Sequence, residues 1–138
     1  MPHVFQINPD KCLIHDTYAG DMTVDEIKYV LMEISMHKDF DPDFDAFTDM
    51  LDCNFMFGPE EQDEIVELFE SVYSGGSGRS AVLINNQTVA AKAKSHADIV
   101  KPVRNMRVFD KREDALRWLG RKANDISKQE AKESYPCL

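Results

Sequence analysis

Five aspartates in one short stretch are the residues of this chain that most resemble a metal site. They occupy places one, three, five, nine and twelve of a possible calcium loop: Asp41, Asp43, Asp45, Asp49 and Asp52. Such a loop needs a glycine at its sixth place and a long bidentate glutamate at its twelfth. Ala46 and Asp52 stand there instead, and Pro42 lies inside the loop. We interpret the run as an acidic loop that enters a strand, and we expect no metal site.

Histidine, cysteine and serine, which supply many nucleophiles, general bases and zinc ligands, are scattered. The four histidines have no spacing typical of zinc ligands: His3, His15, His37 and His96. Nothing near Cys53 in the sequence would lower the pKa of its thiol, so we interpret it as a half-buried structural residue. The glycine-rich residues 74–79 follow an expected helix, whereas a phosphate loop precedes one. We therefore expect no catalytic residue and no cofactor.

Charge is divided unevenly along the 138 residues. The net charge is −9, but residues 1–70 hold 18 acidic and 3 basic side chains, whereas residues 71–138 hold 7 acidic and 13 basic ones. Long-range repulsion from so acidic a chain argues against nucleic acid or an anionic membrane as partner. Two solvated faces of opposite sign would explain the division. The alternative is a dipolar surface used for self-association or for docking a partner.

Length and composition favour one globular domain. No apolar run approaches the roughly 20 residues of a membrane span, and no secretory signal is readable at the N-terminus. Three cysteines without CxxC spacing are typical of free thiols, so we expect a cytoplasmic protein.

Hydrophobic periodicity and turn residues predict five strands and four helices. We expect strands over residues 4–7, 12–18, 46–50, 80–84 and 106–109, with a break at residues 19–21. A capping box from Thr23 to Glu26 predicts the first helix, with His37 and Lys38 in its last turn. The second helix begins at residues 58–61, the third follows residues 85–88 and stops at Pro102, and a second capping box at Asp110 opens a helix that closes at Gly120. We interpret residues 121–138 as a polar helical extension or tail.

This order predicts an α/β domain over residues 1–120. A tight first connection makes an antiparallel hairpin, and later strands separated by helices must pair in parallel. We expect a mixed five-stranded sheet with four helices packed on it.

The pattern resembles the STAS/SpoIIAA-like domains, the fold of bacterial anti-sigma-factor antagonists. Segments 20–26, 39–44, 48–50, 108–109 and 115–120 carry the resemblance, which extends from about His3 to Gly120. It implies a small stand-alone SpoIIAA-like protein. The family's phosphorylatable serine stands at the start of the helix after the third strand. Here that stretch reads Phe57-Gly58-Pro59-Glu60, with no hydroxyl group, so the sequence argues against a phospho-switch.

Two functions follow as hypotheses. The leading one is a non-enzymatic regulatory module that acts through protein contacts or as a homodimer, since Phe55-Met56-Phe57 is too apolar for an uncovered loop. The alternative is a binding protein for a small apolar or amphipathic ligand near the carboxyl ends of the parallel strands. The candidate ligand or partner residues are Phe55, Phe57, Gly58, Asn85, Asn86 and Thr88.

Overall fold

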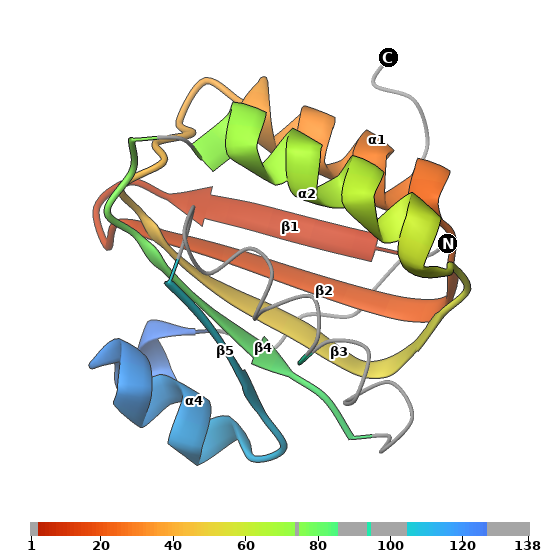
Figure 1. The fold of residues 1–138 in the computed structure, drawn as a ribbon. Coiled ribbons are helices and arrows are strands. Elements are labelled where there is room, and N and C mark those ends of the chain that lie inside the picture. Colours follow the sequence, from red (N-terminus) through yellow and green to blue (C-terminus); the bar gives the residue numbers. More distant parts are fainter. Residues whose placement is uncertain (1–2, 74, 86–93, 95–104, 127–138) are drawn as a thin grey trace.

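A five-stranded sheet forms the centre of the molecule (Figure 1). In this computed structural model, residues 3–73, 75–85, 94 and 105–126 are described. The strands lie in chain order: β1 (His3–Asn8), β2 (Leu13–Met22), β3 (Asp45–Phe55), β4 (Arg79–Leu83) and β5 (Asn105–Phe109). β1 pairs with β2 antiparallel, and all later pairs are parallel, as predicted.

The turn between β1 and β2 is held by short-range hydrogen bonds. The Asn8 side chain accepts from the backbone N–H of Asp10 at 3.1 Å, and Cys12 takes the left-handed conformation with φ of 52°. β2 then continues to Met22, so the predicted break at residues 19–21 is wrong. A register shift between Thr17 and Ala19, followed by Gly20 with φ of 81°, lets the bulged strand keep its pairing with β3.

Two helices cover one face of the sheet (Figure 1): α1 (Val24–Ser35) and α2 (Pro59–Tyr73). Thr23 caps α1 as predicted, because its hydroxyl oxygen accepts from the N–H of Glu26 at 3.3 Å. α1 ends at Ser35, so the prediction that His37 and Lys38 lie in its last turn is wrong. α2 starts at Pro59 as predicted.

The opposite face carries α4 (Arg112–Leu119) and a 3-10 turn over Ala123–Asp125. The predicted capping box at Asp110 is wrong, because Lys111 is the N-cap and makes no side-chain cap hydrogen bond. Gly120 ends α4 in the left-handed conformation with φ of 70°, as predicted. Within the described ranges the structure has three α-helices; the fourth predicted helix falls on a stretch of which only Asn85 and Lys94 are described.

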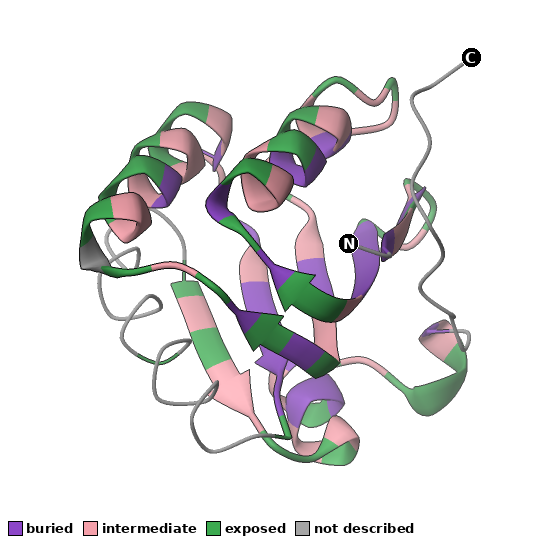
Figure 2. Cartoon of the chain, turned by 90° about the vertical axis from the view of Figure 1, so that its right-hand side faces the viewer, coloured by how far each residue is buried: buried purple, intermediate pink, exposed green. Residues whose placement is uncertain are grey.

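Buried residues lie along the strands and on parts of the helices (Figure 2). They form two clusters, one on each side of the sheet, because side chains alternate along each strand. The cluster under α1 and α2 includes Ile14, Ala46 and Val82. The cluster under α4 includes Leu13, Phe47 and Ala81, each one residue away in the chain, together with Ile126. These strand side chains therefore pack either under α1 and α2 or under α4.

Candidate functional site

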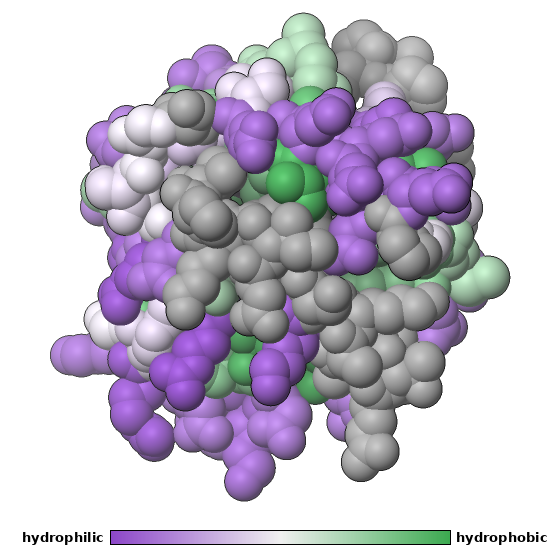
Figure 3. Space-filling model, in the orientation of Figure 1, coloured by the Kyte–Doolittle hydropathy of each residue, from purple (hydrophilic) through white to green (hydrophobic). Residues whose placement is uncertain are grey.

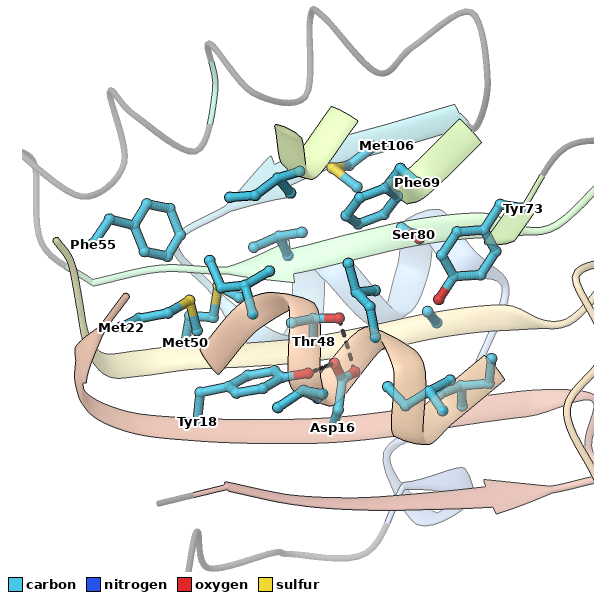
Figure 4. Close-up of a pocket in the computed structure, with 18 of the residues that line it drawn as sticks. Asp16, Tyr18, Met22, Thr48, Met50, Phe55, Phe69, Tyr73, Ser80 and Met106 are labelled. Atoms are coloured by element: carbon cyan, nitrogen blue, oxygen red, sulfur yellow. Dashed lines mark hydrogen bonds between the residues drawn. The ribbon is translucent and has the colours of Figure 1, made fainter. Parts of the chain in front are cut away.

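A cavity of about 90 Å³ lies between the sheet and the helix pair α1 and α2 (Figure 4). Its lining is mostly apolar: Ile14, Met22, Ile27, Val30, Leu31, Ile34, Ala46, Met50, Phe55, Phe57, Ile65, Phe69, Val82 and Met106. Among the described residues, the polar side chains of the lining are Asp16, Tyr18, Thr48, Tyr73 and Ser80. Small-molecule sites commonly measure roughly 300–1,000 Å³, so the space suits a ligand of few heavy atoms.

Asp16, Tyr18 and Thr48 form a hydrogen-bonded polar cluster on the cavity floor (Figure 4). The Tyr18 hydroxyl donates to Oδ2 of Asp16 at 2.5 Å, and the Thr48 hydroxyl donates to Oδ1 at 2.8 Å. Asp16 is 6% exposed. Burying a carboxylate is costly unless hydrogen bonds compensate it, and these two donors supply charge-assisted bonds.

The sheet register explains why these three side chains meet. Asp16 lies directly opposite Thr48 in the β2–β3 pairing, and Tyr18 follows two residues later on the same side of β2. Ile14 and Ala46 form the preceding pair on that face. The alternation that buries Ile14 therefore also buries Asp16.

Tyr18 keeps its proton in this setting. Burial raises its pKa well above the ordinary value of 10, and the Asp16 charge and the hydrogen bond to Asp16 raise it further. The phenol is therefore a permanent donor to Asp16 at physiological pH.

The predicted site residues divide into three groups. Phe55 and Phe57 line the cavity, with ring centroids 5.3 Å apart. Gly58 and the exposed Asn85 do not line it. Asn86 and Thr88 lie outside the described residues. The cavity therefore begins near the predicted end of the sheet, but it extends along the sheet face to Ser80 and Tyr73.

Sequence reasoning missed Asp16, Tyr18 and Thr48 as site residues. A signal was present in residues 13–18, where a carboxylate takes the inward position between Ile14 and Tyr18. A charged residue on the buried side of a strand is unusual enough to mark a site.

The aspartates that resemble a calcium loop hold loops together through backbone amides. Asp43 accepts from the N–H of Ser77 at 2.9 Å, and Asp45 accepts from the N–H of Arg79 at 2.9 Å. Asp45 also pairs with Arg121 at 3.2 Å. Asp49 lies within the extended strand β3, which does not wrap around an ion.

Cys53 is buried more deeply than predicted, with 3% of its surface exposed. Burial and the nearby charges of Asp21 and Glu26 raise the pKa of its thiol to about 12. Since the thiolate is the reactive form, Cys53 is an inert thiol at neutral pH.

The outer surface is mostly hydrophilic in the view of Figure 3, where hydrophobic atoms form small separate areas. Among the described residues, the large hydrophobic side chains that are exposed are Tyr29, Met32, Met36 and Met56. The first three lie on α1 or at its C-cap. No helix in the described part of the chain is both long and apolar enough to cross a membrane.

This sheet order and the placement of the helices define a SpoIIAA-like α/β domain. A solved structure that matches it is an uncharacterized protein of the DUF3478 family with a SpoIIAA-like fold, from Shewanella loihica PV-4. The match has a TM-score of 0.56 and 14% sequence identity, and covers 86% of this chain and 94% of that chain. The predicted SpoIIAA-like fold with a mixed five-stranded sheet is thereby confirmed, whereas the described residues contain three of the four predicted helices. Similarity at this identity concerns the fold alone. No protein-family model and no curated protein matched the sequence.

Proposed function

We propose that this domain is a binding protein for a small, mainly apolar ligand held between the sheet and the helices α1 and α2. The observation that carries the proposal is the cavity, which combines a wide apolar lining with one buried polar cluster. Apolar walls with a few fixed polar groups are the usual composition of small-molecule sites.

Both ends of the cavity support this assignment. Phe55 lies at one end of the cavity and Tyr73 at the other (Figure 4). The ring of Phe57, which also lines the cavity, stacks on that of Phe55. The polar cluster lies between the two ends, so a ligand with an apolar body and one polar group matches the lining.

Methyl-resolved NMR with hexan-1-ol as the probe tests the proposal. We expect concentration-dependent shifts of the methyl groups of Ile14, Ile65 and Val82, which line the cavity from three elements. Ala46→Leu adds side-chain volume inside the cavity and is expected to abolish these shifts. Met56→Leu, at a position that is 55% exposed, is the matched control and keeps them.

Unchanged methyl spectra at saturating hexan-1-ol would rule out ligand binding in this cavity. Thermal unfolding of Ala46→Leu without ligand shows whether that variant is folded. If it is not, Val82→Ile provides a smaller addition to the lining.

A second candidate is a regulatory module that acts through protein contacts or self-association. The exposed side chains on α1 favour it, since Met32 is 45% exposed and Met36 is 78% exposed four residues later on the same side. Sedimentation velocity over a concentration series tests self-association. Met36→Lys is expected to abolish a concentration-dependent increase in sedimentation coefficient, whereas Met56→Lys leaves it unchanged. A monomer at every concentration argues against the homodimer.

A further inference from the structure

A stripe of large apolar side chains lies on the outer side of α1. Tyr29, Met32 and Met36 are all exposed. They are spaced three and four residues apart, so they follow one another along the helix, on the side away from the buried Val30 and Ile34. An apolar patch with charged residues around it is typical of a surface that another molecule covers.

The neighbouring helix α2 presents a row of carboxylates on its outer side. Figures 1 and 2 show α1 and α2 side by side over the same face of the sheet. The sequence of α2 contains six acidic and no basic residues. Those that are exposed recur every three or four residues along the helix: Glu60, Asp63, Glu64, Glu67 and Glu70.

Lys28 connects the apolar stripe to the acidic row. It precedes Met32 by one turn of α1, and its ammonium group pairs with Glu64 of α2 at 2.7 Å. The hydrogen bond to Glu64 raises the pKa of Lys28, and the nearby charges of Asp25 and Glu67 raise it further. Because Lys28 is the only basic residue among nine acidic ones on the two helices, the surface beside the stripe keeps a large excess of negative charge.

From this juxtaposition we infer that the outer face of α1 and α2 docks a basic amphipathic helix of a partner protein. The apolar side of that helix covers Tyr29, Met32 and Met36, and lysines or arginines on its flank pair with the carboxylates of α2. Opposite charge also steers the partner to this face before contact. The inference names a partner class for the protein-contact alternative, and it does not depend on the cavity.

A second copy of this chain fits the same face less well. A two-fold contact places a surface on its own counterpart, so the acidic rows of the two copies would meet. Like charges that face each other across an interface disfavour the contact. Charge complementarity therefore favours a basic partner.

Fluorescence anisotropy with three labelled synthetic peptides tests the inference on the unaltered protein. Each peptide is about 14 residues, or roughly four helical turns, long. The first is an amphipathic leucine–lysine helix, the second has the same composition with its leucines scattered around the helix, and the third replaces every lysine with glutamate. We expect the first peptide to bind at least about tenfold more tightly than the other two at physiological ionic strength, because only it combines one apolar side with positive flanks.

Two variants with matched controls locate the bound peptide. Met32→Lys puts a charge into the apolar stripe and is expected to weaken binding of the amphipathic peptide at least about fivefold, whereas Met56→Lys, at an exposed position outside both helices, leaves it unchanged. Glu67→Lys is expected to weaken binding at least about threefold. Glu113→Lys changes the net charge equally at an exposed position of α4 and leaves binding unchanged.

Equal weakening by Glu67→Lys and Glu113→Lys would show attraction by net charge alone and would overturn the inference, as would equal binding of the amphipathic and scattered peptides. Failure of the amphipathic peptide to bind also overturns it. The occupant is then a second copy if Met32→Lys dissociates a dimer, or a lipid surface if Met32→Lys abolishes binding to phosphatidylcholine vesicles. Each of these results leaves the ligand cavity proposal standing.

Discussion

Neighbouring residues of β2, His15 and Asp16, carry ionisable side chains into opposite layers of the molecule. Asp16 lies in the cavity under α1 and α2, whereas His15 packs against the Phe47 ring under α4, with centroids 5.4 Å apart. Both side chains are buried, but their surroundings differ. Two hydroxyl groups donate hydrogen bonds to Asp16. The surroundings of His15 instead lower its pKa and favour its neutral form.

The pH dependence of stability is predicted to depend on His15. Burial and then the positive charge of Arg112 lower the pKa of His15 from 6.5 to about 4. Between these values the unfolded chain binds more protons than the folded one, so the His15 contribution to the unfolding free energy is present above about pH 6.5 and is lost as the pH falls towards 4. Its size is on the order of 3 kcal/mol or less.

Urea unfolding at a series of pH values measures this effect. The variant His15→Gln is expected to flatten the decline across the window, and His37→Gln, at a half-buried loop position, is the control that keeps it. The same slope in His15→Gln and in the unaltered protein would show that other groups cause the decline.

At the scale of elements, Gly76 lets the α2–β4 connection lie against the loop before β3. A Cβ atom at Gly76 would stand 2.4 Å from the carbonyl oxygen of Pro42. Gly76→Ala is therefore expected to cost about 1–3 kcal/mol of unfolding free energy, because two backbone segments must separate. Chemical denaturation of the variant and the unaltered protein measures this loss of unfolding free energy.

Gly58→Ala is the matched control for this substitution. No atom lies within 4 Å of a Cβ at Gly58, so the change should alter stability by less than about 0.5 kcal/mol. Equal effects of the two substitutions would contradict the close approach at Pro42.

Elements that are specified by local sequence patterns could be predicted, whereas features that depend on contacts between distant residues could not. Strands and helices with strong periodicity, such as the capped helix after Thr23, were recognised because local patterns specify them. The end of β2 was not recognised, because Gly20 and Asp21 are typical turn residues. Their pairing with Cys53 and Asn54 of β3 keeps them extended. The polar cluster escaped for a related reason: the contact of Asp16 with Thr48 joins residues 32 positions apart.

Across the whole molecule, residues 121–126 connect the end of α4 to the first hairpin. Arg121 donates to the backbone carbonyls of Lys11 and Cys12, and Lys11 donates to the carbonyl of Asp125 at 3.3 Å. Ile126 is 4% exposed within the cluster under α4. These contacts join the two ends of the described chain across one sheet.

Ile126→Ala is therefore predicted to destabilise the whole domain. Removing a buried isoleucine side chain costs about 2–5 kcal/mol, and one cooperative transition would move to lower denaturant. Met36→Ala, at an exposed apolar position, is the control and should change stability by less than about 0.5 kcal/mol. An unchanged midpoint for Ile126→Ala would place residues 121–126 outside the cooperative unit.

Ligand binding between the sheet and the helix pair is tested most directly by the position of a bound probe in solution. We predict intermolecular nuclear Overhauser effects from the hydroxymethylene protons of hexan-1-ol to the methyl group of Thr48, and from its chain to Ile14 and Val82. Nuclear Overhauser effects only to Met32 and Met36 on the outer side of α1, or no effects to the residues that line the cavity, would contradict ligand binding between the sheet and the helix pair.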